Sequence, residues 1–130
     1  MKKWIKISFL CVVLIAALII CLFGYLLYQF SSPPKITIIN NSNSVLQNII
    51  VSGSGFLKEI KSLEPQTSTV IKVHPPGESG LIIKFKADSR EFGKDDLAYI
   101  ESSGGYRITI TISDNLEITS KQIYRKYWFF

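Results

Sequence analysis

Apolar and polar residues follow two distinct patterns along this chain, and the first is a long uninterrupted apolar run. Residues 7–30 are 24 consecutive residues without a charged side chain. As an α-helix this run would be about 36 Å long, enough to cross a hydrocarbon core of about 30 Å with some tilt. Trp4 lies near one edge and Tyr25 and Tyr28 near the other, where aromatic side chains favour the headgroup level. The pattern predicts a transmembrane helix over residues 7–30.

Basic residues on one side of the apolar run predict its orientation. Three lysines lie within residues 1–6, whereas the linker of residues 31–34 carries no charge. The positive-inside rule places the basic end in the cytoplasm. We therefore expect a single-pass protein of the cytoplasmic (inner) membrane whose residues 35–130 lie outside or in the periplasm.

A cleaved signal peptide is the main alternative to an uncleaved anchor. Its apolar region would be 7–15 residues long and followed by a small-residue cleavage site. Here the run is longer, and the bulky Phe30 stands at the outer of the two small positions. Cys11 and Cys21 follow Leu10 and Ile20 instead of the small residue that precedes a lipidated cysteine. Both observations favour a signal anchor that stays attached.

The second pattern begins at residue 35 and consists of short alternating runs, typical of β-strands. In residues 106–112 the large apolar side chains Tyr, Ile, Ile and Ile alternate with Arg and Thr. One face of such a strand is buried and the other is solvated. Residues 113–115 provide a turn, and residues 116–119 resume the alternation. These two runs are predicted to form a hairpin.

The remaining runs complete an all-β domain over residues 35–130. They are residues 35–39, 46–51, 56–60, 69–73, 81–86 and 97–100. We expect the first two to pair across residues 40–44, and residues 75–80 to form a loop because two prolines remove backbone donors. The charged residues 88–96 are interpreted as a solvated loop between strands. Seven or eight antiparallel strands at this spacing predict a β-sandwich or a small barrel.

Part of this domain resembles bacterial immunoglobulin-like modules, over about residues 36–73. The similar segments are Ile-Thr-Ile-Ile-Asn-Asn-Ser at residues 36–42, Leu-Gln-Asn-Ile-Ile-Val at residues 46–51, and Leu-Glu-Pro-Gln-Thr-Ser at residues 63–68. Gln66 stands where those modules usually have glycine in the turn. The resemblance implies an immunoglobulin-like antiparallel sandwich of seven or eight strands after the transmembrane helix, and it implies no ligand.

Composition narrows the function classes. With 130 residues, 47% hydrophobic and 19% charged, the chain is long enough for one compact domain. Two cysteines and one histidine exclude zinc ribbons and disulfide frameworks. The net charge of +5 falls to +2 from residue 33 onward, where 12 basic residues face 10 acids. We therefore expect neither a nucleic-acid partner nor a cofactor.

Candidate catalytic chemistry is sparse. His74 is the only histidine and precedes two prolines, so it is interpreted as a surface loop residue. Asp95 and Asp96 lie in the densest acidic stretch, which lacks the acid spacing of a calcium-binding EF-hand loop. The alternative hypothesis is a small envelope enzyme whose site is assembled from these three residues and nearby hydroxyls.

The C-terminal seven residues hold five aromatics and two cations. They are Tyr124, Arg125, Lys126, Tyr127, Trp128, Phe129 and Phe130. Two interpretations remain open, namely a last strand whose rings cover one end of the sandwich and a partner-binding tail with residue types typical of interface hot spots. In the apolar run, Ala17, Cys21 and Gly24 form a stripe of small residues that would allow a weak homodimer.

These observations favour a non-enzymatic role. The preferred hypothesis is a membrane-tethered extracytoplasmic protein-binding module. Such a module would be an accessory subunit of an envelope complex, or an inhibitor or immunity-type protein. Confinement near a membrane raises its effective concentration for partners at the same surface.

Overall fold

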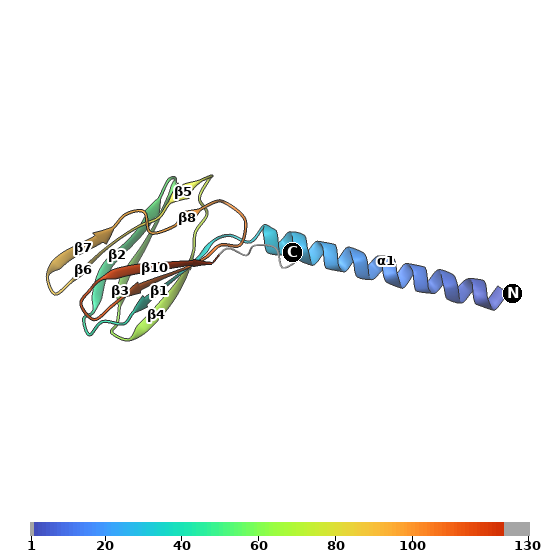
Figure 1. Cartoon of the computed structure of the whole chain (residues 1–130), viewed down its shortest axis with the longest axis horizontal. Helices are drawn as coiled ribbons and strands as arrows, with labels where there is room; N and C mark the ends of the chain where they lie inside the picture. Colours follow the sequence, from blue (N-terminus) through green and yellow to red (C-terminus); the bar gives the residue numbers. More distant parts are fainter. Residues whose placement is uncertain (1, 124–130) are drawn as a thin grey trace. The chain divides into compact units, whose positions relative to one another are not determined.

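The computed structural model of the chain describes residues 2–123. The chain divides into two compact units, with the division between Ser31 and Ser32. Within residues 2–123, the first unit contains the one helix and the second contains all the strands (Figure 1).

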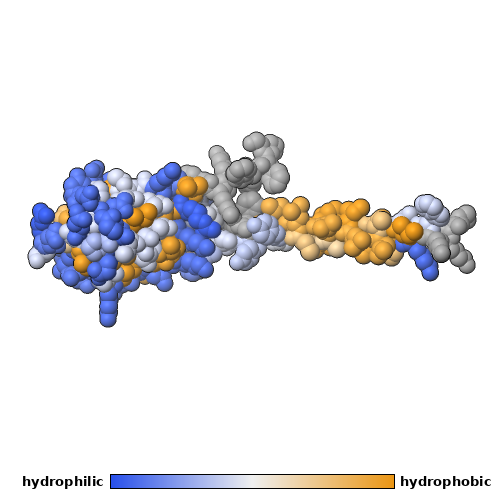
Figure 2. Space-filling model, turned by 90° about the horizontal axis from the view of Figure 1, so that it is seen from below, coloured by the Kyte–Doolittle hydropathy of each residue, from blue (hydrophilic) through white to orange (hydrophobic). Residues whose placement is uncertain are grey.

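Helix α1 (Lys2–Phe30) is 29 residues long and contains the predicted apolar run. Its stretch Lys6–Tyr28 has 23 residues with a mean hydropathy of 3.0 and is unburied. In Figure 2 the visible side of this stretch is hydrophobic over most of its length. By length and composition, α1 is the one helix among residues 2–123 that can cross a membrane. It starts before residue 7 because no proline or glycine separates residues 2–6 from the run.

The second unit contains ten strands within the described residues, two of them only two residues long. They are β1 (Lys35–Asn40), β2 (Leu46–Gly53), β3 (Phe56–Leu63), β4 (Thr67–Lys72), β5 (Ser79–Gly80), β6 (Ile82–Ala87), β7 (Arg90–Lys94), β8 (Tyr99–Ile100), β9 (Arg107–Ile112) and β10 (Ile118–Ile123). Sheet A has the order β10-β9-β1-β4, sheet B has the order β3-β2-β6-β7, and β5 pairs with β8. The prediction of a mostly β chain with one N-terminal apolar helix is confirmed.

The pairing expected for β1 was wrong. β1 does not form a hairpin with β2, but pairs antiparallel with β4 and parallel with β9. The sheets are therefore not purely antiparallel. Asn40, at the end of β1, is buried and donates hydrogen bonds to the carbonyls of Ser44 and Leu63. These bonds lead the connection between β1 and β2 out of sheet A and into sheet B.

The alternation of residues 106–112 was interpreted correctly. β9 and β10 form an antiparallel hairpin in which Ile112 is paired with Ile118. Ile108 and Ile110 are buried, as the alternation predicted. In β6, Ile83 and Phe85 are buried in the same way. Alternation therefore identified the buried face of both strands.

The charged stretch at residues 88–96 was expected to be a loop, but most of it forms edge strand β7. Its register with β6 places Glu91 opposite Lys86 and Phe92 opposite Phe85. The two phenylalanine rings stack with centroids 5.4 Å apart. Asp88 and Ser89 have φ values of 50° and 61°, the left-handed conformation that a tight hairpin turn requires. An edge strand with charged side chains resembles a loop in sequence because little of it is buried.

One hydrophobic core lies between sheets A and B and receives side chains from both. Its fully or nearly fully buried residues are Ile36, Ile38, Leu46, Ile49, Val51, Leu63, Val73, Leu81, Ile83, Phe85, Ala87, Leu97, Ile100, Ile108, Ile110, Ile112, Leu116 and Ile118. Cys11 and Cys21 both lie in α1 as free thiols. The strand domain is therefore held together by packing and hydrogen bonds, without a disulfide within the described residues.

Candidate interaction site

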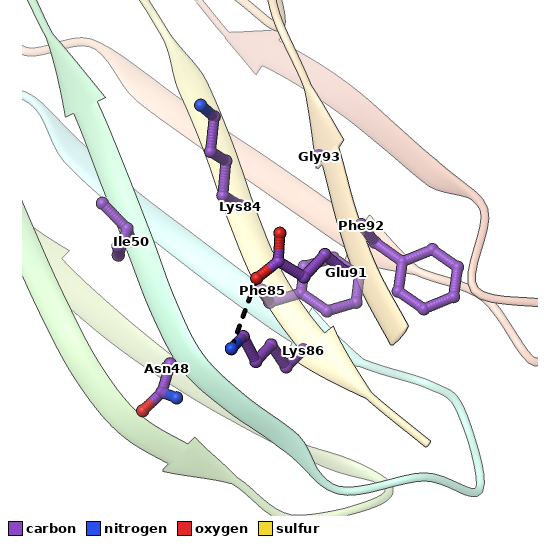
Figure 3. A pocket seen from close by; sticks show the side chains of 8 residues that line it. All are labelled: Asn48, Ile50, Lys84, Phe85, Lys86, Glu91, Phe92 and Gly93. Carbon is purple, nitrogen blue, oxygen red and sulfur yellow. Dashed lines mark ion pairs between the residues drawn. The ribbon is translucent and has the colours of Figure 1, made fainter. Parts of the chain in front are cut away.

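The outer face of sheet B is hollowed where β2, β6 and β7 lie side by side. The hollow has a volume of about 510 Å³ and is lined by Asn48, Ile50, Lys84, Phe85, Lys86, Glu91, Phe92 and Gly93 (Figure 3). Gly93 lies opposite Lys84 in the register, and the absence of a side chain there opens space over β6. A Cβ at Gly93 would lie 3.2 Å from Lys84 Cγ. We call this surface the sheet B hollow.

Backbone irregularity on β2 shapes the side of the hollow that Asn48 lines. The pairing of β2 with β6 shifts register between Gln47 and Ile50. Within this bulge Asn48 has a φ of 49°, a conformation that asparagine tolerates better than most residues. The bulge leaves Asn48 exposed, and Ile49 turns into the core. Ile50 is then half-buried on the outer face between β3 and β6.

A second hollow shares part of this lining. It has a volume of about 450 Å³ and is lined by Asn48, Ile50, Glu59, Ile60 and Lys61. Ile50 is paired with Glu59 on one side and with Lys84 on the other. An apolar side chain flanked by charges of both signs is suited to contact a polypeptide that carries both kinds of group.

The one ion pair among the described residues lies at the rim of the sheet B hollow. Lys86 Nζ is 3.3 Å from Glu91 Oε1, and the two side chains are 50% and 78% exposed. An ion pair as exposed as this one contributes at most about 1 kcal/mol to stability. Both groups therefore remain accessible to a partner at little cost.

A second polar cluster, separate from the Lys86–Glu91 ion pair, lies at the small sheet of β5 and β8. The Tyr99 hydroxyl donates a hydrogen bond to Glu101 Oε1 at 3.0 Å. Partial desolvation, followed by the effects of the Glu101 and Glu78 carboxylates, raises the pKa of Tyr99 well above its ordinary value. Because the Tyr99 side chain is 40% exposed, the two carboxylates are the stronger physical reason for this rise.

The residues of the enzyme hypothesis lie in exposed segments. His74 follows β4, and Asp95 and Asp96 follow β7. Within the described residues His74 forms no hydrogen bond or ion pair with either aspartate. None of the three lines either hollow. Residues 2–123 contain no group of three or more His, Cys, Asp or Glu that could hold a metal ion.

Two further predicted surfaces have different outcomes. The aromatic tail, Tyr124 to Phe130, lies outside the described residues, so its two interpretations stay open. Ala17, Cys21 and Gly24 lie on the exposed surface of α1. A Cβ at Gly24 would meet no atom within 4 Å.

Sequence reasoning missed the sheet B hollow, because only the register brings Asn48, Lys84 and Gly93 of three strands together.

Comparison with known proteins gives a fold likeness and no family. No family model matches the chain, and no curated protein matches it. Among solved structures it is similar to one described as the NMR structure of the protein from Eubacterium rectale. The two share 15% sequence identity with a TM-score of 0.50, over 76% of this chain and 94% of that chain. At this identity the likeness concerns the fold alone.

Proposed function

We propose that this chain is a membrane-tethered, immunoglobulin-like module that binds a protein partner outside the cytoplasmic membrane. The observation that carries the proposal is the position of Ile50. It is a half-buried apolar side chain at the centre of the outer face of sheet B, between two hollows and flanked by Glu59 and Lys84. A partly exposed apolar centre with a charged rim is the usual anatomy of a protein interface.

Two features support the immunoglobulin-like part of the proposal. Sheets A and B each have four strands and share one core. Gln66 has a φ of 58°, so it occupies the left-handed position at which the resembling modules have glycine.

Tethering is the mechanism by which this module would act. Helix α1 anchors the chain, and the three lysines at its N-terminal end favour an outward strand domain. Restricting the domain to the membrane surface raises its effective concentration for a partner there, so modest contacts suffice. The partner would be a subunit of an envelope complex, or a protein that this chain inhibits as an immunity-type factor.

Affinity capture from the native membrane tests the proposal. The full-length chain, an Ile50→Lys variant, a Thr111→Lys variant and a chain lacking residues 124–130 are captured, and the bound proteins are identified. Thr111→Lys is the matched control, since Thr111 is half-buried on the outer face of sheet A. We expect a specific partner to be lost with Ile50→Lys and retained with Thr111→Lys.

The other outcomes would change or end the proposal. Loss of the partner only on deletion of residues 124–130 would move the interface to the tail. Equal loss with both lysine variants, while circular dichroism shows a folded domain, would contradict an interface on sheet B. Absence of a specific partner in every sample would contradict the binding role itself.

A further inference from the structure

Sheet A carries four cations on its outer face. Lys35 of β1 is paired with Lys72 of β4 and with Arg107 of β9, so these three side chains form one row across the sheet. With neighbouring strands about 4.8 Å apart, their Cα atoms lie within about 10 Å. Lys121 of β10 is paired with Thr109, one outward position farther along. We call these four residues the cationic face.

No acid of the described chain neutralises the cationic face. Within residues 2–123 its four side chains form no ion pair and no hydrogen bond. Arg107 is half-buried, and its Nη1 is buried without an acceptor among those residues, so a partner from outside meets the other cations of the face more readily. The outer face of sheet B differs, because Glu59 and Glu91 there balance Lys84 and Lys86. Gathered, unpaired cations of this kind are suited to an anionic partner.

The row of three cations lies at the end of sheet A where the chain enters the strand domain. Lys35 follows the end of α1 by five residues, which can span at most about 18 Å. The Val73 amide donates to the Pro34 carbonyl at 3.2 Å, and the Gly105 amide donates to the Ser32 carbonyl at 3.2 Å. These bonds hold the end of β4 and the segment before β9 against the linker.

We propose that the cationic face binds the anionic phospholipid headgroups of the membrane in which α1 is anchored. Phosphate oxygens accept hydrogen bonds from guanidinium and ammonium groups, and several basic residues near a bilayer add their attractions. The proposal rests on α1 spanning the membrane and is independent of the protein-binding role of sheet B. Sheets A and B turn their outer faces in opposite directions, so this contact would leave the sheet B hollow open to a partner.

The test uses the full-length chain in vesicles of phosphatidylcholine, with or without added phosphatidylglycerol. Cys11→Ala and Cys21→Ala remove the native thiols, and Thr37→Cys carries a fluorophore on the outer face of sheet A. A quencher attached to lipid headgroups reports the approach of this face. We expect the ratio of docked to undocked domain to be about tenfold or more higher in the anionic vesicles, and to fall at high salt.

Two charge-matched variants locate the effect. One replaces four cations on sheet A, by Lys35→Gln, Lys72→Gln, Arg107→Gln and Lys121→Gln. The other replaces four on sheet B, by Lys58→Gln, Lys61→Gln, Lys84→Gln and Lys86→Gln. We expect the first to abolish the preference for anionic vesicles and the second to leave it unchanged. Circular dichroism checks folding, and the exposed pair Lys72→Gln and Lys121→Gln replaces the first variant if that variant unfolds.

Two results would overturn the proposal. Equal quenching in neutral and anionic vesicles would mean that the tether alone brings the domain near the surface. Equal loss of the preference in the sheet A and sheet B variants would mean that net charge, and not this face, is responsible.

Discussion

At the scale of single residues, Asn40 connects the two sheets. It is fully buried, and its Nδ2 group donates to the carbonyls of Ser44 at 2.9 Å and of Leu63 and Glu64 at 3.1 Å. Its Oδ1 accepts from the amide and the hydroxyl of Ser42. One amide side chain at the end of β1 therefore satisfies backbone groups of the following loop and of the end of β3.

Replacing this amide should destabilise the strand domain. We expect Asn40→Ala to lower the free energy of unfolding by about 2–4 kcal/mol, because it leaves several buried polar groups without partners. Urea unfolding followed by circular dichroism measures the change. Asn41→Ala is the control, because the Asn41 side chain is exposed and should matter by less than about 0.5 kcal/mol. Similar losses in both variants would contradict the role of Asn40.

Gln66 has a backbone conformation that is unusual for glutamine. Its φ of 58° is a left-handed conformation that glycine adopts more readily than glutamine does. Its Nε2 group donates to the carbonyls of Asn41 at 2.8 Å and Ser42 at 3.2 Å. These hydrogen bonds offset the conformational strain and hold the turn between β3 and β4 against the loop after β1. The glutamine side chain therefore stabilises the turn.

The raised pKa of Tyr99 predicts how the stability of the fold depends on pH. Its pKa in the folded chain is raised above the ordinary value of about 10. The folded state thus holds the phenolic proton more tightly than the unfolded state does. The resulting stabilisation is present below about pH 10 and is lost as the pH rises above it. Absorbance titration of tyrosinate should show a late-ionising component that is lost in Tyr99→Phe, and an unchanged titration would contradict the contact.

At the scale of elements, α1 differs from the strands because nothing in the described chain buries its apolar surface. Its stretch Lys6–Tyr28 is 0% buried and is long and apolar enough to cross a membrane. Each strand, by contrast, buries at least one face or one side chain within the domain, and the charged β7 does so through Phe92.

Charges in the middle of α1 should therefore prevent stable membrane integration. Leu14→Arg combined with Leu18→Arg is expected to cost about 5–7 kcal/mol of insertion free energy. Carbonate extraction of membranes should then release most of the protein. Trp4→Arg, at the edge of the helix, should leave the protein in the membrane fraction. Retention of the double variant would show that α1 does not rely on a hydrocarbon environment.

The free edge of β10, the outer strand of sheet A, is covered by hydrogen bonds that involve side chains. Gln122 accepts a hydrogen bond from the Tyr99 amide at 3.2 Å, and its Nε2 donates to the Tyr99 carbonyl. Lys94 Nζ donates to the Ile118 carbonyl at 2.8 Å, and the Ser120 hydroxyl donates to the Leu97 carbonyl. These contacts cover the edge of β10 without a further strand, which limits unwanted strand pairing there.

At the scale of the whole molecule, the distribution of charge makes a prediction about topology. By the positive-inside rule, the basic N-terminal end and the uncharged linker predict a strand domain outside the cytoplasm. In a chain with Cys11→Ala and Cys21→Ala, we expect Asp114→Cys to react with a membrane-impermeant maleimide on intact cells or spheroplasts. Lys3→Cys should react only after permeabilisation. The reverse pattern of labelling would mean that the domain faces the cytoplasm.

The unequal faces of the strand domain are also a property of the whole molecule. From residue 33 onward the net charge is only +2, since 12 basic residues face 10 acids. The fold nevertheless separates these charges, with unpaired cations on sheet A and both signs on sheet B. The domain therefore presents two chemically different surfaces despite its nearly neutral composition.

The sequence by itself determined the helix, the β class and the buried side of the clearest strands. These features depend on local composition and on alternation, as in Ile108, Ile110 and Ile112. The sequence did not predict strand β7, because an exposed edge strand with Arg90, Glu91 and Lys94 has few apolar residues. Such local patterns say which side chains are buried and leave open which strands are neighbours.

Only the tertiary structure decided the pairing and the surfaces. Whether Ile36 lies beside Ile71 and Ile108 or beside a residue of β2 depends on contacts between distant parts of the chain. The same register brings Lys35, Lys72 and Arg107 into one row and gathers the lining of the sheet B hollow. Because these groups come from separate strands, their chemistry exists only once the sheets have assembled.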